Sequence, residues 1–395
     1  MRPVRVKRRE SKPNLPVDAD GGRVENLSSR RSFLKGAAVA TVAGAASAFP
    51  KSSPAQAVTL KVQTAWRPQD IFHEMARQYT DRVEAMSGGR LKIQLLAVND
   101  IAKLHEIQDA VHKGVLDGAY TATVTWYDKH KAASLFGTGP VFGTNAAQLL
   151  AWIHRGGGKE LYRELVQDML KLNLVGFFSN PVPTQPLGWF KEEIKTPDQL
   201  KGLRYRTVGL AMDVMQAMGL EVLRLPGPGV IPAFKRGVLD AFEFNNPTSD
   251  RQLGAQDVAK HYMLGSFHQA SELFEIIFNK DQFESLPKDH QAILEYAAEA
   301  AGTANYALAM DRHSQDLEEL ITKDGVDVHR TPQSVMEEQL KAWDSVLSEL
   351  MKEPFFRKIV ESQRTWARRV AFYDLLNAAD YRLAYRHYFP NRIDF

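Results

Sequence analysis

The sequence contains no cysteine among its 395 residues. This absence excludes disulfide bonds, thiolate-bound metals, iron–sulfur clusters and cysteine nucleophiles. Other catalytic signatures are missing as well. The run "RGGGKEL" lacks the first glycine and the Ser or Thr of a phosphate-binding loop, because Ile153 and Glu160 stand at those positions. The chain has no Gly-x-Ser-x-Gly elbow and no His-Glu-x-x-His pair, so no nucleophile or metalloprotease constellation is visible.

The chain also has no excess of positive charge outside its first residues. Its formal net charge is +3, but residues 1–57 hold 11 Lys and Arg against 4 Asp and Glu. That segment carries +7, which leaves −4 for residues 58–395. A mildly acidic mature chain gives no reason to expect a nucleic-acid partner.

Residues 1–57 read as an export leader. Arg30 and Arg31 belong to the motif "SRRSFLK", a weakly apolar "GAAVATVAGAASAF" follows, and "AQA" at 55–57 is a small-residue cleavage site. This pattern is typical of a twin-arginine signal peptide, which is read by a translocase for folded cargo. The alternative, a membrane anchor, is disfavoured because the apolar stretch is too short and too weakly apolar. We therefore expect cleavage after Ala57 and a periplasmic mature protein.

The mature chain alternates strand and helix patterns in two successive stretches. Residues 58–182 predict a β-α-β-α-β order followed by helices and a strand, and residues 183–270 predict a second α/β stretch. The helical patterns from residue 287 onward exceed ordinary globular lengths. Helices of this length bridge two lobes or meet a partner subunit, and a plain helical cap is the alternative.

One short phrase occurs in both stretches. "KGVLDG" at 113–118 and "RGVLDA" at 236–241 each follow a short amphipathic helix and precede a strand pattern. Four identical residues recur by chance about as often as not in a chain of this length, so the shared setting carries the argument. We expect two similar helix-to-strand corners, one in each of two α/β lobes.

Polar residues follow the predicted strands of the second stretch. Arg206 closes the strand "LRYR" just before a helix start, where open α/β sheets bind ligands and a helix N-terminus favours an anion. An arginine grips a carboxylate through two parallel hydrogen bonds, so Arg206 is the candidate anchor and Arg204 the competing one. A surface arginine is the alternative. The remaining polar candidates are Gln185, Glu243, Asn245, Asn246, His268 and Gln269.

Glu243 and aromatic residues at strand ends extend this candidate site. Glu243 beside amides offers hard oxygen ligands for a sodium or calcium ion, and a helix-capping or hinge-bonding glutamate is the alternative. The aromatic residues could wall a ligand pocket, or they could be core; they are Trp66, Trp126, Tyr127, Trp189 and Phe267.

Several stretches resemble one known family. "KTPDQLKGLRYR", "KRGVLDAFE", "SGGRLKIQLLA" and "WIHRGGGKELYREL" are similar to solute-binding proteins of tripartite ATP-independent periplasmic (TRAP) transporters, over nearly all of residues 58–395. "GGGKEL", "QPLGWF" and "GSFH" look most like the branch that binds 2-oxo acids, hydroxy acids and similar monocarboxylates, grouped with mannitol and chloroaromatic systems.

The resemblance implies a two-lobed α/β periplasmic binding protein, type II-like, with a cleft that closes on the ligand and long C-terminal helices spanning the lobes. Lobe I would be residues 58–182 and lobe II residues 183–270. Residues 271–395 would return to lobe I and form the long helices.

The resemblance also implies roles for single residues. Arg206 would grip the ligand carboxylate, Gln185 and Glu243 would bind a Na⁺ or Ca²⁺ ion beside it, and Phe244 would add its backbone carbonyl. Gln269 stands where that branch has an acidic ligand, so one negative charge is missing at the cation site. We further expect ligand contacts from Gln185, Asn245, Trp126 and His268.

We therefore expect a periplasmic receptor that captures a small organic acid, a 2-oxo or 2-hydroxy monocarboxylate, for an ion-gradient-driven TRAP permease. One alternative is a twin-arginine-exported enzyme, against which the missing cysteines and dinucleotide glycines count. Another is a binding protein that feeds a sensor kinase. The aromatic-rich C-terminal helices predict a homodimer formed by helix exchange or packing.

Overall fold

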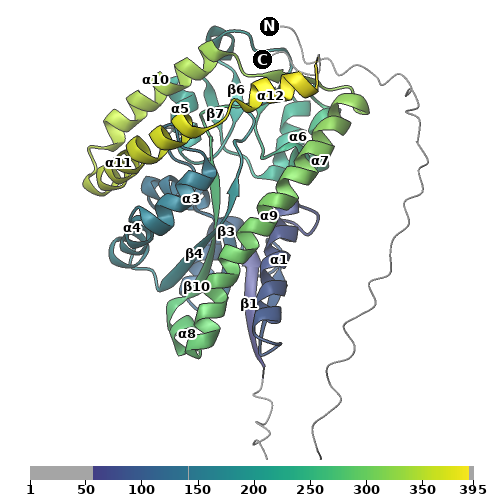
Figure 1. Cartoon of the computed structure of the whole chain (residues 1–395). Coiled ribbons are helices and arrows are strands. Elements are labelled where there is room, and N and C mark those ends of the chain that lie inside the picture. The colour runs from purple at the N-terminus through teal and green to yellow at the C-terminus, as the bar shows by residue number, and fades with distance from the viewer. Residues whose placement is uncertain (1–56, 141, 391–395) are drawn as a thin grey trace, which may run out of the picture. The chain divides into compact units, whose positions relative to one another are not determined.

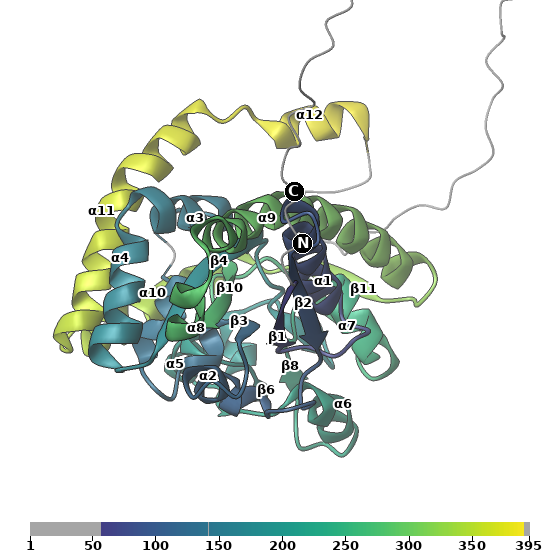
Figure 2. The ribbon, with the colours of Figure 1, turned by 90° about the horizontal axis from the view of Figure 1, so that it is seen from below.

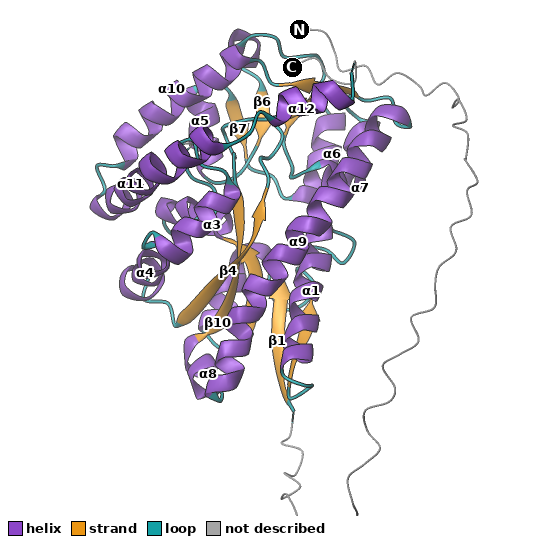
Figure 3. Cartoon of the chain, viewed as in Figure 1, coloured by secondary structure: helices purple, strands orange, loops and turns teal. Residues whose placement is uncertain are grey.

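The computed structural model describes residues 57–140 and 142–390, so all of the leader except Ala57 lies outside the described residues. Within this range two β-sheets are flanked by helices, as Figure 3 shows. The predicted mixed α/β fold with long C-terminal helices is confirmed. No helix among the described residues is long and apolar enough to cross a membrane.

The first sheet has the strand order β2-β1-β3-β10-β4. β1 pairs in parallel with β2 and β3, whereas β10 runs antiparallel between β3 and β4. We call this sheet and the helices packed on it lobe I. Its strands are β1 (Val58–Thr64), β2 (Leu91–Leu96), β3 (Gly118–Ala122), β4 (Leu174–Val182) and β10 (Glu272–Asn279).

The second sheet has the order β11-β9-β5-β8-β6-β7, and we call it, with its helices, lobe II. β5 runs antiparallel to β8 and β9, and the other pairs are parallel. The stretch 271–395 therefore contributes to both sheets, because β10 joins lobe I and β11 joins lobe II. The strands are β5 (Gly188–Phe190), β6 (Arg204–Arg206), β7 (Glu221–Leu223), β8 (Ala241–Phe242), β9 (His261–Leu264) and β11 (Asp327–Arg330).

Helices cover both sheets and connect them. α9 packs against α1 and β4 in lobe I and against α7 in lobe II, and Figure 1 shows it running along both lobes. α10 packs on α5 and α11 on α3 and α4. The helices are α1 (Ile71–Met86), α2 (Ile107–His112), α3 (Ala146–Arg155), α4 (Gly158–Arg163), α5 (Leu210–Ala217), α6 (Gly227–Lys235), α7 (Pro247–Leu253), α8 (Lys280–Ser285), α9 (Lys288–Thr322), α10 (Gln333–Leu350), α11 (Pro354–Asn377) and α12 (Tyr381–Tyr388).

α9 is held differently by the two lobes. Toward lobe I it buries small apolar residues at helical spacing, Leu294, Ala297, Ala298 and Ala301 among them. Toward lobe II its charged residues meet Arg251 of α7, which pairs with Asp316, Glu319 and Asp324 at or just beyond the end of the helix. Leu320 of the helix is also fully buried in the core of lobe II, so the contact with lobe II is both apolar and ionic.

The two copies of "GVLD" form the same helix-to-strand corner. Gly114 and Gly237 follow α2 and α6 with positive φ angles of 72° and 69°, a backbone conformation that glycine adopts without a Cβ clash. The leucine two residues later is fully buried in each copy, at Leu116 and Leu239. One strand of each sheet then begins, β3 after the first corner and β8 after the second.

The aspartate of each corner makes the same two bonds to the neighbouring strand. Asp117 donates its backbone N–H to the carbonyl of Lys61, and its carboxylate accepts from the N–H of Lys61 at 2.6 Å. Asp240 does the same with Arg204, at 2.8 and 3.2 Å. The repeated phrase therefore fixes the start of one strand in each lobe, as the sequence predicted.

The lobes are closed on each other in this structure. The hydroxyl of Tyr127 in lobe I donates to Asp213 of α5 at 2.6 Å, and Lys131 pairs with the same carboxylate at 2.5 Å. Gly209, which precedes α5, lies so near lobe I that a Cβ there would be 2.2 Å from Cγ2 of Val124. Residue 209 must be a glycine for this approach, because its φ is also positive, at 61°.

Candidate functional site

Arg206 is the last residue of β6, and it is only 6% exposed. Its Nη1 donates to the backbone carbonyl of Glu243 at 2.9 Å and to Oε1 of the same residue at 3.0 Å. Its Nε donates to the carbonyl of Leu225 at 3.1 Å, and the ring of Phe244 lies 5.7 Å from the guanidinium carbon. Nη2 makes no hydrogen bond with any described residue, so one corner of a rigidly held guanidinium is available to an anion.

Arg204, the competing arginine, is committed elsewhere. Its Nε and Nη2 each donate to the carboxylate of Asp240 at 2.8 Å, and its side chain is 41% exposed. Lys191 pairs with the same carboxylate. These two cations hold the pKa of Asp240 well below its usual range, with the hydrogen bonds from Arg204 as the largest cause. Of the two arginines, only Arg206 is buried, and its Nη2 makes no hydrogen bond with a described residue.

Two buried carboxylates lie in this region. Glu243 follows β8 and is fully buried, and burial raises its pKa to about 7 although Arg206 lowers it. Glu272 is the first residue of β10 and is also buried. Burial raises the pKa of Glu272 to about 8, and the negative charge of Glu243 adds to the rise. The charge of Glu243 acts on Glu272 and both side chains are buried, so the two carboxylates lie in one poorly solvated region.

Gln185 connects this pair to Gln269. Its side-chain Nε2 donates to the carboxylate of Glu272, and its backbone N–H donates to the carbonyl of Gln269 at 3.0 Å. Several buried polar atoms have no hydrogen-bond partner among the described residues, namely Oε1 of Gln185, Oε2 of Glu243, and both Oε1 and Nε2 of Gln269. An unpaired buried polar group costs about 1–3 kcal/mol, so this set marks a place that a polar ligand or an ion completes.

Gly188 allows the strands under this region to come together. It has a φ of 122°, and a Cβ at this position would lie 2.2 Å from the carbonyl oxygen of Phe242 and 3.0 Å from Cα of Glu243. β5 pairs with β8 there. The glycine of "QPLGWF" therefore lets the strand after Gln185 lie directly against the strand that ends at Glu243.

His268 and Asn245 adjoin these residues in the chain. His268 is buried and its Nδ1 shares a 2.6 Å hydrogen bond with Oγ of Ser266, while its Nε2 has no partner among the described residues. Burial lowers the pKa of His268 to about 3, so the ring is neutral. Asn245 is half-buried, and its backbone N–H donates to Asp250 at 2.9 Å.

Trp126 is buried in lobe I. Its indole N–H donates to Glu275, a carboxylate in the interior of lobe I that also accepts from Thr121 at 2.9 Å and Tyr162 at 2.5 Å. None of these contacts involves Arg206. The indole N–H of Trp126 therefore makes a core contact, and its contact with a ligand stays a prediction.

The other aromatic candidates lie in different parts of the structure. Trp66 packs among three rings of lobe I, and Trp189 stacks on Tyr262 at 4.2 Å and donates to Asp250. Trp189 is a core residue, and Trp66 is partly buried against the core of lobe I. Tyr127 lies at the lobe contact described above, and Phe267 is held by α10 through its backbone N–H and carbonyl.

Glu272 is the residue that the sequence reading missed. It stands three positions after Gln269, where a negative charge had been expected. The available signal was the phrase "ELFEIIF", which has two glutamates in an otherwise apolar strand. All eight residues of β10 are buried. A charged residue inside such a strand is rare unless it is paired, so it indicates a site or a buried polar cluster.

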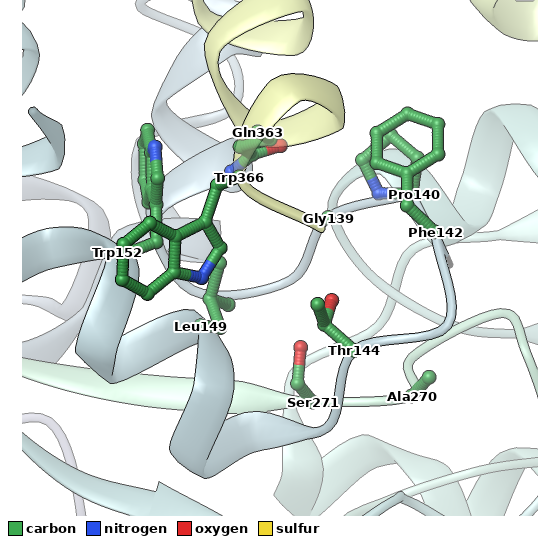
Figure 4. A pocket seen from close by; sticks show the side chains of 10 residues that line it. All are labelled: Gly139, Pro140, Phe142, Thr144, Leu149, Trp152, Ala270, Ser271, Gln363 and Trp366. Atoms are coloured by element: carbon green, nitrogen blue, oxygen red, sulfur yellow. The ribbon is translucent and has the colours of Figure 1, made fainter. Parts of the chain in front are cut away.

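A small pocket lies on the far side of the segment that links Gln269 to Glu272. Ala270 and Ser271 line one part of it, and Trp152 of α3 and Trp366 of α11 line another, as Figure 4 shows. No charged side chain lines this pocket. It is therefore not suited to an acid, and it shows instead that α11 backs the segment carrying the two candidate residues.

The sequence of this chain matches a known family and a characterised relative. Residues 62–358 match the family described as bacterial extracellular solute-binding protein, family 7. The monocarboxylate 2-oxoacid-binding periplasmic protein of Nostoc sp. is 27% identical over 359 residues, which cover 89% of this chain and 97% of the relative.

Three solved structures match this chain over nearly all of their own length. A TRAP solute-binding protein from Bordetella bronchiseptica, a dimer with calcium and picolinate, has a TM-score of 0.78, 28% identity and coverage of 84% of this chain and 98% of its own. Those from Colwellia psychrerythraea, with calcium and pyruvate, and Pseudoalteromonas atlantica, with sodium and pyruvate, have TM-scores of 0.77 and 0.76. Their identities are 29% and 28%, and both cover 85% of this chain and 100% of their own.

Proposed function

This chain belongs to family 7 of the bacterial extracellular solute-binding proteins, and from that premise we propose that it captures a 2-oxo or 2-hydroxy monocarboxylate for a TRAP permease. The membership confirms the expectation of a binding receptor rather than an enzyme. It also agrees with the resemblance read from the sequence.

The unpaired Nη2 of Arg206 carries the proposal. Arg206 is buried and bonds Glu243, whose Oε2 has no hydrogen-bond partner among the described residues. The same holds for Oε1 of Gln185 and for both amide atoms of Gln269. A ligand carboxylate there would meet a guanidinium that two backbone carbonyls already hold in place. Closure excludes the water that would otherwise screen the pair, and ligand contacts to both lobes would favour the closed state.

The oxygen atoms of the site fit a hard cation beside the ligand. Oε1 of Gln185, Oε2 of Glu243 and Oε1 of Gln269 are buried acceptors without partners among the described residues, and the carbonyl of Phe244 follows directly. Oxygen donors of this kind suit Na⁺ or Ca²⁺. Such an ion would offset the charge of the ligand carboxylate. The calcium and sodium seen with pyruvate in similar proteins support this assignment.

Calorimetric titration of residues 58–395 tests the ligand class. We expect pyruvate, 2-oxobutyrate and lactate to bind, and pyruvamide, which keeps the size of pyruvate but lacks its carboxylate, to bind at least about tenfold more weakly. Equal affinity for pyruvate and pyruvamide would show that the ligand is not recognised as an acid.

We propose twin-arginine export for the segment outside the described residues. Arg30 and Arg31 are the diagnostic pair, and replacing both by lysine should leave the precursor in the cytoplasm. Cell fractionation measures the outcome. Normal periplasmic amounts of the double variant would contradict this route.

We also propose that the C-terminal helices join two copies of the chain. Phe372, Tyr373, Leu375 and Leu376 at the end of α11 are 66–75% exposed, and no residue of α12 is buried. Figure 2 shows α12 standing apart from both sheets. The dimer of the similar Bordetella protein supports a second copy as the partner of this surface. Light scattering should give twice the mass of one mature chain, and removal of residues 372–395 should halve it.

A further inference from the structure

We propose that Glu272 supplies the negative charge that Gln269 lacks, and that it orients Gln185 so that the cation site selects a divalent over a monovalent ion. This inference rests on the proposed function, because it concerns the same site. It assigns to Glu272 a role that neither the sequence pattern nor the comparisons give it.

The position of Glu272 places its carboxylate within reach of the site. It opens β10 opposite Val182, the last residue of β4, and Gln185 follows Val182 by three residues. Its side chain is buried and contacts Gln185 directly. Glu272 and Gln269, three residues apart, therefore both contact Gln185.

The contact with Glu272 fixes which end of the Gln185 amide faces the unpaired atoms. A bound cation would favour the ionised form of Glu272. An ionised carboxylate only accepts hydrogen bonds, so it takes the Nε2 end of the amide. Oε1 is then turned away from Glu272 and is left without a partner among the described residues. A neutral amide at position 272 would accept either end of Gln185, and this selection would be lost. Glu272 is therefore a positioning residue for an oxygen ligand.

The charges of the site favour a divalent ion. A cation bound here would favour the ionised forms of Glu243 and Glu272, and their two negative charges then outweigh the one positive charge of Arg206. Asp250 adds a further negative charge near Glu243, although four donors already surround it: Trp189, Tyr262 and the backbone N–H groups of Asn245 and Asn246.

A bound monocarboxylate makes this region still more negative. A monovalent ion would leave an uncompensated charge in the closed interior, which is costly. Ca²⁺ also accepts more oxygen ligands than the protein alone offers, which leaves positions for the ligand's own oxygens.

The test uses Ca²⁺ and Na⁺ as probes, first without any organic ligand and then with pyruvate. Thermal unfolding of chelated residues 58–395 is followed while each ion is added, and pyruvate is then titrated calorimetrically with each ion present. We expect the parent to be stabilised by calcium more than by sodium. Glu272→Gln should weaken calcium binding on the order of tenfold and sodium binding less, so that the calcium-to-sodium preference falls.

Two further variants distinguish a change in the calcium-to-sodium preference from a general loss of stability. Gln269→Glu combined with Glu272→Gln returns the carboxylate to position 269 and should recover the calcium preference. Glu275→Gln removes another buried carboxylate of the same strand, and it should leave the preference unchanged.

The inference is overturned if Glu272→Gln keeps the parent's preference within about threefold, or if Glu275→Gln lowers it equally. Failure of the proposed function looks different, because pyruvate would then not bind the parent while the ion titrations still report on Glu272. A parent that binds pyruvate but responds to neither ion would overturn this inference and leave carboxylate capture standing.

Discussion

Strand β10 carries two buried glutamates, Glu272 and Glu275, in different surroundings. Burial raises the pKa of both. Glu275 accepts hydrogen bonds from three neutral side chains of lobe I, which bind both of its carboxylate oxygens. Glu272 has one partner, Gln185, and its neighbours include several unpaired polar atoms. Burial and a raised pKa are therefore common to both, and only the unfilled hydrogen-bonding capacity distinguishes a binding region from a structural cluster.

The largest loss of pyruvate affinity is expected on substitution of Arg206, which pairs with Glu243 in the proposed binding region. Arg206→Ala removes the one donor aimed at a ligand carboxylate and leaves Glu243 without its cation. Removing one partner of a desolvated charged pair costs about 2–5 kcal/mol, so pyruvate should bind roughly 30-fold to several-thousand-fold more weakly. Arg206→Lys should recover only part of this loss, because an ammonium cannot also bind the two carbonyls that hold the guanidinium.

Arg204→Ala is the matched control for that measurement. Arg204 pairs with Asp240 at the surface, so calorimetry should give an affinity within about threefold of the parent. If Arg204→Ala abolishes binding and Arg206→Ala does not, the anchor is the other arginine. If neither matters, the ligand is not held as an acid.

At Glu275 and its three hydrogen-bond donors we expect the opposite result, a loss of stability without a loss of pyruvate affinity. Tyr162→Phe removes a hydrogen bond to the charged Glu275, which should lower the free energy of unfolding by about 1.5–3 kcal/mol in urea titrations. Pyruvate affinity should stay within about threefold of the parent. A variant with unchanged stability and weakened binding would place Glu275 in the binding region and remove the distinction drawn here.

Gly209 tests the site through closure rather than through contact. A Cβ at this residue would clash with Val124 across the lobes and would also require a positive φ. Gly209→Ala should therefore disfavour the closed state and weaken pyruvate binding by about tenfold. Small-angle scattering should show a larger radius with pyruvate than the parent has. Adding Val124→Ala should recover part of the affinity, and a single variant that binds like the parent would contradict the closed geometry.

A smaller effect is expected at Asp70, a third carboxylate, which caps α1 and accepts from Ser249 of α7 at 3.3 Å. Burial raises the pKa of Asp70 to about 6 from 3.8. The folded state therefore binds the proton more tightly than the unfolded state, and this group adds stability as pH falls from about 6 to about 4. Asp70→Asn should remove that gain, on the order of 1 kcal/mol per pKa unit. Urea titrations with the same pH dependence in both proteins would contradict it.

Several features could be predicted from the sequence because local pattern determines them. The "GVLD" corners follow from a glycine stop, a buried leucine and an aspartate that bonds the adjacent strand. Arg206 could be singled out since it ends a strand before a helix. The long helices were visible in their length alone.

Other features depend on contacts that no local pattern records. Trp126 is 149 positions from its partner Glu275, so its place in the core could not be read from its surroundings in the chain. β10 is buried on both faces and shows no alternation, which hid Glu272. β11 has four residues between two long helices, so its addition to lobe II was not evident either.

The two attachments of α9 differ in the charges that they carry. Apolar residues hold the helix to both lobes, with Leu294 buried toward lobe I and Leu320 buried toward lobe II. Lobe II adds the cluster of Arg251 with three carboxylates in partly solvated surroundings, whereas the ion pair of Arg312 with Glu74 on the lobe I side is a single exposed pair. Added electrolyte screens such charges and leaves apolar contacts intact. Ionic strength should therefore loosen the attachment to lobe II more than the attachment to lobe I. The salt content of the surrounding fluid would then adjust how readily the receptor opens, without any change at the ligand itself.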